Sequence, residues 1–538
     1  MHMTIKNREI ISLTVVLFIL SLLSGCESPS RIPEEPSVPP PVIDSNTTIG
    51  SLTEIFAPDA IAVEGYGIVG GLNGTGSSEC PPNVRSYLTQ YILRKLPEQT
   101  MDVDAFINSP NTAVVIVDGI MPAAVAKNEY FDVRVRALPG TQTTSLEGGW
   151  LYGADLKAKG NFGLTIKILA EAEGPVFIDT LDGQTDKRSG YILAGGTVLD
   201  EYKITIALRY PDFKTAAMIR DKLNERFGRG TATALTAGQI QLTVPAKYKT
   251  QKQRFIAIVR ATHLLSTPEL TKQRISSLVQ KLATAKDKLP SEIALEAIGK
   301  DGLSQLEPLL SSSDQKVRLG AAICMLNLGS DKGLEVLRET VLDTASPYRV
   351  DAFQMICASA NRNDAATLAR KLLRDKDFNV QLEAYEQLRK MDDIVITRQL
   401  IARNFYLEQI AESPRKAIFV ARSGQPRIVL FGAPIRCKQD IFIQSSDGNI
   451  TINAPPGQQY ISIIRKHPTR PNVIIQLKSS YELSDLIVKM CEEPLKEKGQ
   501  GQVGLNVSYG EMILLLRKMC EKGAIDAEFH AGPLPNQI

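Results

Sequence analysis

The pattern of apolar and polar residues predicts both strands and helices in the first half of the chain. Apolar residues occupy every second position over residues 131–136 and 204–208, as in strands with one buried face. After Asp212, apolar residues recur every three or four positions until Gly228. This predicts a helix that the aspartate caps and the glycine ends. Strands and helices are mixed along this half, which indicates an α+β body.

The pattern changes to paired helices over residues 286–395. Three similar apolar segments, 33 and 30 residues apart, begin at Val317, Val350 and Val380. Each follows a second apolar helical segment, and residues 291–298 supply a degenerate first helix. The period and the pairing resemble HEAT repeats, whose units bury their apolar faces only by stacking. We therefore expect a small helical solenoid, with a generic helical bundle as the alternative.

The last part of the chain predicts a hairpin followed by two helices. Residues 440–454 alternate on both sides of a turn at Asp447, and helical patterns follow over 481–490 and 510–522, the second capped by Ser508. The sequence therefore predicts an α+β fold. A mixed, strand-rich region is interrupted by an α-helical HEAT-like solenoid, and the chain closes with a small α/β segment.

Residues 1–26 form a predicted export signal. Their apolar run, residues 10–23, is too short to span a bilayer as a helix, which takes about 20 residues. The Leu-Ser-Gly sequence before Cys26 resembles a bacterial lipobox, in which the cysteine is acylated and becomes the new N-terminus. An ordinary cleaved signal is the alternative. Residues 27–50 carry six prolines and no apolar period, which predicts an extended tether between a lipid on Cys26 and the folded body.

Charge and composition argue against several classes of function. The chain has 62 Lys and Arg residues against 59 Asp and Glu, a net charge of +3, without a long block of like charge. No nucleic-acid partner is therefore expected, because phosphate binding usually requires a concentrated basic surface. Histidine is rare, with four in the chain, and neither H-E-x-x-H nor C-x-x-C occurs. We therefore expect no enzyme activity, no metal and no cofactor.

A glycine-rich stretch, residues 63–78, raises the alternative of a nucleotide-binding site. Gly65, Gly67 and Gly70 spell G-x-G-x-x-G, the fingerprint of a dinucleotide-binding loop. That loop requires a helix directly after the glycines, because the helix N-terminus faces the phosphates. Here three more glycines and two prolines follow instead. We therefore interpret the glycines as turn residues between short strands, and not as a nucleotide site.

The same stretch carries a family resemblance. Several motifs follow one another in a fixed order along the chain. They are the Gly-Tyr-Gly and Gly-Leu-x-Gly-Thr-Gly elements, the strand at 131–135, the turn at 145–149 and the Pro-Asp-Phe helix start at 211. In these motifs and their order the chain resembles the flagellar P-ring protein family. The family-motif turn glycines are Gly65, Gly67, Gly71, Gly74 and Gly76. We therefore predict a P-ring-like N-terminal region over 51–270. The closing helix pair resembles the family again, which predicts a P-ring-like C-terminal region over 417–538.

The resemblance implies a structural function. P-ring proteins are secreted subunits that assemble as a ring around the flagellar rod at the peptidoglycan layer, where the ring acts as a bushing beside the L ring. It implies a homo-oligomeric ring, rod and L-ring proteins as partners, and a periplasmic place in the basal body. We expect the lipid on Cys26 in the outer rather than the inner membrane. Both the lipobox and the helical block depart from the family. The alternative function is a lipid-anchored periplasmic scaffold that reuses the fold, with the repeats as its protein-binding surface.

The cysteines fall into two groups. Cys324 and Cys357 each lie seven residues after an aligned valine of the repeats, which predicts small buried core residues. Cys491 and Cys520 each follow Lys-Met at the end of a predicted helix in the closing pair. An oxidising periplasm would allow a disulfide between them, although the sequence does not fix their separation.

Overall fold

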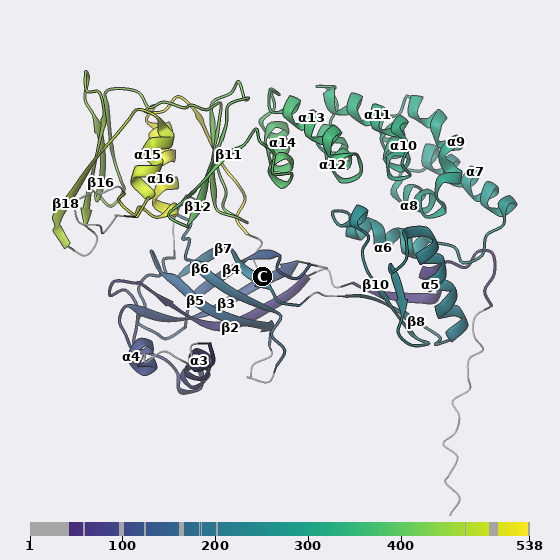
Figure 1. The fold of residues 1–538 in the computed structure, drawn as a ribbon, viewed down its shortest axis with the longest axis horizontal. Coiled ribbons are helices and arrows are strands. Elements are labelled where there is room, and N and C mark those ends of the chain that lie inside the picture. The colour runs from purple at the N-terminus through teal and green to yellow at the C-terminus, as the bar shows by residue number, and fades with distance from the viewer. Residues whose placement is uncertain are drawn as a thin grey trace, which may run out of the picture. The chain divides into compact units, whose positions relative to one another are not determined.

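The computed structural model describes residues 42–57, 60–95, 102–122, 125–160, 166–181, 183, 186–200, 203–467, 470–493 and 504–535. The predicted signal, the lipidation candidate Cys26 and the first part of the tether lie outside these residues. From Ser45 onward the chain forms one compact unit, and Figure 1 shows its helices and strands. No helix in the described part is long and apolar enough to cross a membrane.

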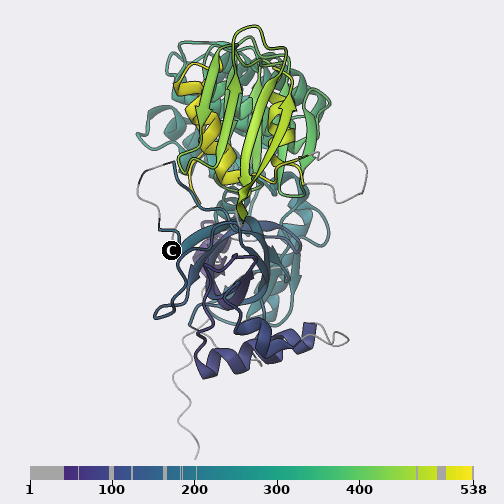
Figure 2. The same ribbon diagram turned by 90° about the vertical axis from the view of Figure 1, so that its left-hand side faces the viewer.

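The first body is a closed β-barrel with the strand order β2-β3-β4-β7-β6-β5. Figure 2 shows the ring that these strands form. The strands are β2 Ala60–Gly70, β3 Thr112–Pro122, β4 Tyr130–Ala137, β5 Trp150–Ala158, β6 Ala170–Pro175 and β7 Ser189–Val198. The predicted alternation in β4 is confirmed, because Phe131, Val133 and Val135 are buried in the barrel interior. Helices α3 (Pro82–Lys95) and α4 (Val103–Ile107) cover part of the outer wall.

The barrel is an insertion into a smaller α+β body. The chain leaves this body after β1, forms the barrel, and returns at β8 in a sheet of order β1-β8-β10-β9. Its elements are α2 Ile49–Leu52, β1 Thr53–Phe56, β8 Ile204–Leu208, α5 Phe213–Phe227, β9 Ala232–Ala234, β10 Gln239–Leu242 and α6 Lys252–Ala261. As predicted, the Asp212 side chain caps α5, where it accepts a hydrogen bond from the Thr215 N–H at 2.7 Å, and Gly228 ends the helix with φ of 103°.

The third body consists of paired helices. They are α7 Pro268–Thr284, α8 Leu289–Ile298, α9 Leu303–Leu306, α10 Gln315–Asn327, α11 Asp331–Leu342, α12 Arg349–Ser359, α13 Arg362–Leu372 and α14 Phe378–Lys390. The three aligned segments form α10, α12 and α14, and α11 and α13 alternate with them as predicted. Helix α7 begins before the predicted boundary at residue 286. The assignment of this body to HEAT repeats stays a prediction.

The C-terminal body is larger than the small closing segment that the sequence predicted. A mixed sheet has the order β11-β12-β14-β13-β19, and an antiparallel sheet has the order β15-β16-β17-β18. The strands are β11 Thr397–Ile401, β12 Phe405–Ile410, β13 Ala417–Val420, β14 Arg427–Phe431, β15 Ile441–Gln444, β16 Ile450–Ala454, β17 Ile461–His467, β18 Arg470–Ser479 and β19 Glu528–Ala531. Because β13 and β14 are buried along their whole length, they lack the alternation that marks a half-exposed strand.

Two helices, α15 (Leu483–Cys491) and α16 (Tyr509–Glu521), pack between the two sheets, as Figure 1 shows. The opposite face of the mixed sheet carries Phe419, Val429 and Phe431, which share one apolar cluster with helices α10 to α14. The mixed sheet is therefore covered on both faces. The helical body shares its core with the C-terminal body, and is not a loosely tethered appendage.

Candidate functional site

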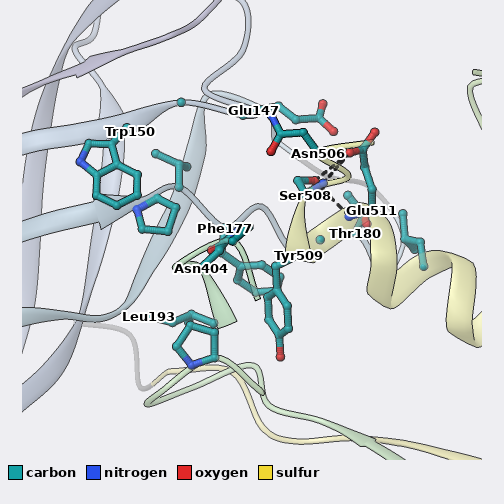
Figure 3. A pocket seen from close by; sticks show the side chains of 18 of the residues that line it. Glu147, Trp150, Phe177, Thr180, Leu193, Asn404, Asn506, Ser508, Tyr509 and Glu511 are labelled. Atoms are coloured by element: carbon teal, nitrogen blue, oxygen red, sulfur yellow. Dashed lines mark hydrogen bonds between the residues drawn. The ribbon is translucent and has the colours of Figure 1, made fainter. Parts of the chain in front are cut away.

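A cavity of about 1450 Å³ lies between the barrel and the C-terminal body. Figure 3 shows Glu147, Trp150 and Leu193 on the barrel side, facing Asn506, Ser508 and Glu511 near the start of α16. The β11–β12 turn adds Asn404, which Figure 3 also labels. The cavity therefore takes its walls from segments that are far apart in the sequence.

A turn and the first residue of β5 position the side chains on the barrel wall of the cavity. Gly148 has φ of 73°, a conformation that favours glycine, and it turns the chain between Glu147 and the start of β5 at Trp150. The Glu147 carboxylate pairs with the Lys187 ammonium at 2.8 Å, and this hydrogen bond raises the pKa of Lys187. Trp150 pairs with Gly70 on one side and with Pro175 on the other. Its side chain is 43% exposed and lines the cavity.

The opposite wall is held by the first turn of α16. Ser508 and Glu511 form the predicted capping box, with the Ser508 N–H donating to the Glu511 carboxylate at 2.9 Å. The Arg465 guanidinium lies 3.6 Å from the same carboxylate. Next to the cap, the buried Tyr509 hydroxyl donates to the carbonyl of Ala421 at 2.7 Å. Burial raises the pKa of this hydroxyl, which therefore acts as a structural hydrogen-bonding group.

Direct contacts join the two walls. The Asp132 carboxylate on β4 accepts hydrogen bonds from the backbone N–H of Ala194 at 2.7 Å and of Gly424 at 2.8 Å. Gly424 belongs to the β13–β14 loop, so this side chain ties the barrel to the C-terminal body. Burial raises the pKa of Asp132, and the two backbone hydrogen bonds oppose that rise. The Phe177 and Tyr509 rings, with centroids 5.7 Å apart, add an apolar contact.

Replacing Asp132 with alanine is expected to loosen this junction at a cost of about 1–3 kcal/mol, because two backbone N–H groups lose their acceptor. Hydrogen exchange followed by mass spectrometry should show faster exchange in peptides that contain Ala194 and Gly424. Asp526→Ala, at an exposed position, is the matched control and should leave these peptides unchanged. Unchanged exchange in the Asp132 variant would contradict this role.

The cavity offers binding groups and no catalytic constellation. The residues that line it include no histidine and no cysteine. Among the residues that the structure describes, no group of three or more His, Cys, Asp or Glu side chains is placed to hold a metal ion. Sequence reasoning did not identify the cavity. The one feature of the sequence that could have pointed to the cavity is Trp150, the only tryptophan of the chain, which directly follows the turn at 145–149.

The structure corrects the interpretation of the motif glycines. Gly71 and Gly74 have φ of 79° and 90° and lie in a turn, as predicted. Gly65 and Gly67, however, lie inside β2, where β5 approaches closely. A Cβ on Gly65 would collide with the backbone oxygen of Asp155, and one on Gly67 would lie 2.7 Å from the Leu151 Cδ1 atom. These two glycines therefore permit close strand contact in the closed barrel. Gly76 likewise has no room for a Cβ, because it lies against the Thr112 carbonyl.

Gly65→Ala should destabilise the protein by about 1–3 kcal/mol, because the methyl group overpacks the contact between β2 and β5. The urea unfolding midpoint, followed by far-UV circular dichroism, measures this effect. Gly302→Ala is the control, since the nearest atom to a Cβ there is 3.8 Å away and φ is not positive. We expect that control to be neutral or to stabilise by about 0.4–1 kcal/mol. Equal effects of both substitutions would contradict the close-contact role.

The possible disulfide between Cys491 and Cys520 is not formed in the structure, where both carry free thiols. Cys491 ends α15 beside the start of α16, where the Val507 N–H donates to the Met490 carbonyl at 2.9 Å. Cys520 lies at the other end of α16, nine residues after Glu511, or about 13 Å along the helix. Disulfide-bonded Cα atoms lie within about 7 Å of each other. Cys520 instead neighbours Cys437, whose pKa is raised to about 12 by burial and, to a smaller extent, by the Cys520 charge.

Comparison with known proteins shows that the first two bodies are similar to one family. Residues 49–275 match the family model described as flagellar P-ring protein. This range contains the whole barrel and the α+β body around it. Through this region the chain is similar to the flagellar P-ring protein family. We call residues 49–275 the P-ring region.

Individual relatives agree with this match. The chain is 33% identical to the flagellar P-ring protein of Thermotoga maritima over 210 residues, which are 36% of this chain and 60% of that protein. It is 28% identical over 222 residues to the Helicobacter pylori protein of the same name, covering 39% of this chain and 60% of that protein. The Bdellovibrio bacteriovorus protein is 26% identical over 280 residues, covering 49% and 79%. The chain thus spans about 60% of the length of the first two relatives.

The P-ring region contains Gly65, Gly67, Gly71, Gly74 and Gly76, together with the barrel wall of the cavity. The other wall, and the helical body apart from the first part of α7, lie beyond the match. The predicted P-ring resemblance of residues 417–538 therefore stays a prediction.

Proposed function

We propose that this protein is a structural subunit of the flagellar P ring. In this role it assembles with copies of itself as a ring around the distal rod, at the peptidoglycan layer of the periplasm, and performs no catalysis. The observation that supports the proposal is the family match over residues 49–275. Because the match spans two complete folded bodies, it favours a shared structural role over the borrowing of a short motif.

The proposal assigns roles to the parts that depart from the family. A lipid on Cys26 would hold the subunit at the outer membrane, with residues 27–50 as the tether. The helical body, which we propose to be HEAT-like, would not move independently, because its apolar cluster is continuous with the mixed sheet of the C-terminal body. It would therefore present a fixed surface to rod, L-ring or wall-associated proteins.

Electron microscopy of basal bodies purified from the native cells would test this function. Antibodies raised against residues 286–395 are expected to label a periplasmic ring around the rod. Basal bodies from a strain that lacks the gene serve as the control and should carry no label. Intact but unlabelled basal bodies in cells that make the protein would overturn the proposal. That outcome would favour the lipid-anchored binding scaffold outside the flagellum.

A further inference from the structure

We propose that copies of this protein join through the antiparallel sheet of the C-terminal body, with β18 of one copy pairing with β15 of the next. The sheet has the order β15-β16-β17-β18, so β15 and β18 are its two edges. Figure 2 shows this sheet from its outer side, away from helices α15 and α16. A strand without a neighbour presents a row of N–H and C=O groups that can pair with another strand.

The backbone groups at the β15 edge are those of Phe442 and Gln444. Alternate residues of an antiparallel ladder hydrogen-bond to neighbours on opposite sides. The Ser445 N–H donates to the Ile450 carbonyl at 2.8 Å, which fixes the alternation between β15 and β16. The odd-numbered residues of β15 therefore bond to β16, and Phe442 and Gln444 turn their N–H and C=O groups to the free edge. Their side chains lie on the outer face, where Phe442 is 62% exposed.

At the β18 edge the same reasoning selects Ile474, Gln476 and Lys478. The Lys466 N–H donates to the Asn449 carbonyl at 2.9 Å, so even-numbered residues of β17 bond to β16 and odd-numbered ones bond to β18. The register between β17 and β18 then leaves the even-numbered residues of β18 with their backbone groups at the free edge. All three side chains are exposed on the outer face. The free groups of both edges thus belong to outer-face residues, as a continuous antiparallel sheet requires.

The core-facing side chains of the two edges are complementary. Ile475 and Leu477 of β18 face the core of the C-terminal body and are half-buried, whereas Ile441 and Ile443 of β15 are buried. The register that places Ile443 opposite Ile475 also places Ile441 opposite Leu477. Apolar side chains directly opposite each other stabilise a pair of strands. The contact would therefore continue the apolar layer of one copy into the next.

The same register matches the outer face. It places Phe442 opposite Gln476 and diagonally beside Ile474, which is 65% exposed, so that two exposed apolar side chains cover each other. It also places Asp440, just before β15, opposite Lys478. Opposite charges directly across a pair of strands favour this register.

The paired segments lack the usual protection against another strand. Residues 441–444 and 473–477 include no charged residue and no proline, because Arg470, Pro471 and Lys478 lie outside the paired part of β18. The mixed sheet differs, since its edge strands β11 and β19 each carry a charged residue. Charged side chains and proline are common means by which proteins keep an edge strand unpaired. The unprotected edges therefore indicate a partner strand, and a second copy of the chain presents both.

The strand directions make the contact head-to-tail. Strands β15 and β17 run one way, and β16 and β18 run the other way. A next copy, related by rotation about an axis parallel to the strands, therefore brings its β15 antiparallel to β18. A heterologous contact of this kind gives a ring when the rotation between copies closes. The inference rests on the proposed function for this closure, and it deepens that function by naming the surface through which copies join.

Disulfide cross-linking in the native cells would test the inference. Phe442→Cys combined with Gln476→Cys places one thiol on each edge at directly opposite positions, with Cα atoms about 5.5 Å apart, within the range of a disulfide. We expect a series of reducible multimers on non-reducing gels. Either cysteine alone should give no more product than the wild type, whose own cysteines set the background. Co-expression of the two single-cysteine chains should give dimers and no longer products.

Thr451→Cys with Gln476→Cys is the matched control and should give background only, because Thr451 lies on the interior strand β16. In the chain with both edge cysteines, Ile474→Lys should lower the multimer yield at least ~10-fold, since a charge on the edge opposes pairing. Thr451→Lys adds the same charge away from the edge and should leave the yield unchanged. Circular dichroism and the melting temperature of the purified variants would establish that each is folded.

Three results would overturn the inference. They are background cross-linking of the chain with both edge cysteines, cross-linking by either cysteine alone, and an unchanged yield with Ile474→Lys. Cross-linking reports contact between copies, whereas antibody labelling reports the place in the basal body. A labelled ring without cross-links would therefore refute this interface and leave the proposed function standing, and cross-links without a labelled ring would do the reverse.

Discussion

Replacing Glu408 with alanine is expected to destabilise the protein by about 3–5 kcal/mol. This carboxylate on β12 is fully buried, and it accepts hydrogen bonds from the Tyr385 hydroxyl and, at 2.9 Å, from the Arg389 Nε–H. Both donors belong to α14, so Glu408 is a polar link between the last helix of the helical body and the mixed sheet, beside the pair of Arg427 with Glu386. The variant would leave the buried Tyr385 hydroxyl without its acceptor and the partly buried Arg389 guanidinium without this counter-charge.

The free energy of unfolding from urea titration measures this loss. Glu412→Ala is the matched control, because Glu412 pairs with Arg374 where both side chains are well exposed, and such surface pairs contribute about 0–1 kcal/mol. Glu408→Gln should lie between the two, since an amide oxygen still accepts one hydrogen bond but the counter-charge of Arg389 is lost. If Glu408→Ala costs no more than Glu412→Ala, the buried link does not stabilise the protein.

The second large effect is expected for Glu296→Ala, also at about 3–5 kcal/mol. Glu296 lies on α8 and is 1% exposed, and its carboxylate accepts from the Arg254 Nε–H at 3.0 Å and from the Asn327 amide at 2.9 Å. Arg254 belongs to α6 of the α+β body, so this pair joins the P-ring region to the helical body. Without the carboxylate, the Arg254 charge would face only Glu292, at the longer distance of 3.4 Å.

Hydrogen exchange in peptides from α6, α8 and α10 would localise this effect. Exchange should increase in these helices and remain unchanged in β2 and β3 of the barrel, which share no contact with the cluster. Glu307→Ala is the matched control on the helical body, since Glu307 pairs with Lys332 in an exposed position. Replacing Arg254, Glu292 and Glu296 together with apolar residues should restore part of the lost stability, because none of these three charges is then left without its partner. A triple variant that is less stable than Glu296→Ala would contradict this account.

Short sequence patterns were sufficient to predict those features that depend on contacts between residues close together in the chain. The cap at Asp212, the alternation in β4, the hairpin of β15 and β16 and the capping box at Ser508 all depend on contacts within a few residues. The repeated valine segments likewise predicted α10, α12 and α14, because helix periodicity is visible within one helix. The family resemblance came from several such motifs in a fixed order, and the match to residues 49–275 agrees with it.

Other features depend on contacts that the sequence does not display. Gly65 has the same neighbours in the sequence whether it lies in a turn or in a strand, and only barrel closure against β5 shows that it has no room for a side chain. Cys491 and Cys520 each lie at the end of a similar helix. In the structure, however, Cys491 lies beside the start of α16 and Cys520 lies at its end, so the length of α16 separates them. The central strands β13 and β14 are covered on both faces, so they carry no alternation that could reveal them.

The sequence alone thus determined the local elements, their order and the resemblance to a family, because each depends on residue spacing within short segments. Only the tertiary structure decided that the helical body shares a core with the mixed sheet, and that Glu296 and Glu408 form buried links at its two ends. It also decided that Trp150, Asn404 and Asn506, which are far apart in the chain, line one cavity. The physical reason is that burial and the shape of a cavity arise from packing between distant segments, and that packing exists only once the barrel has closed and the sheets have paired.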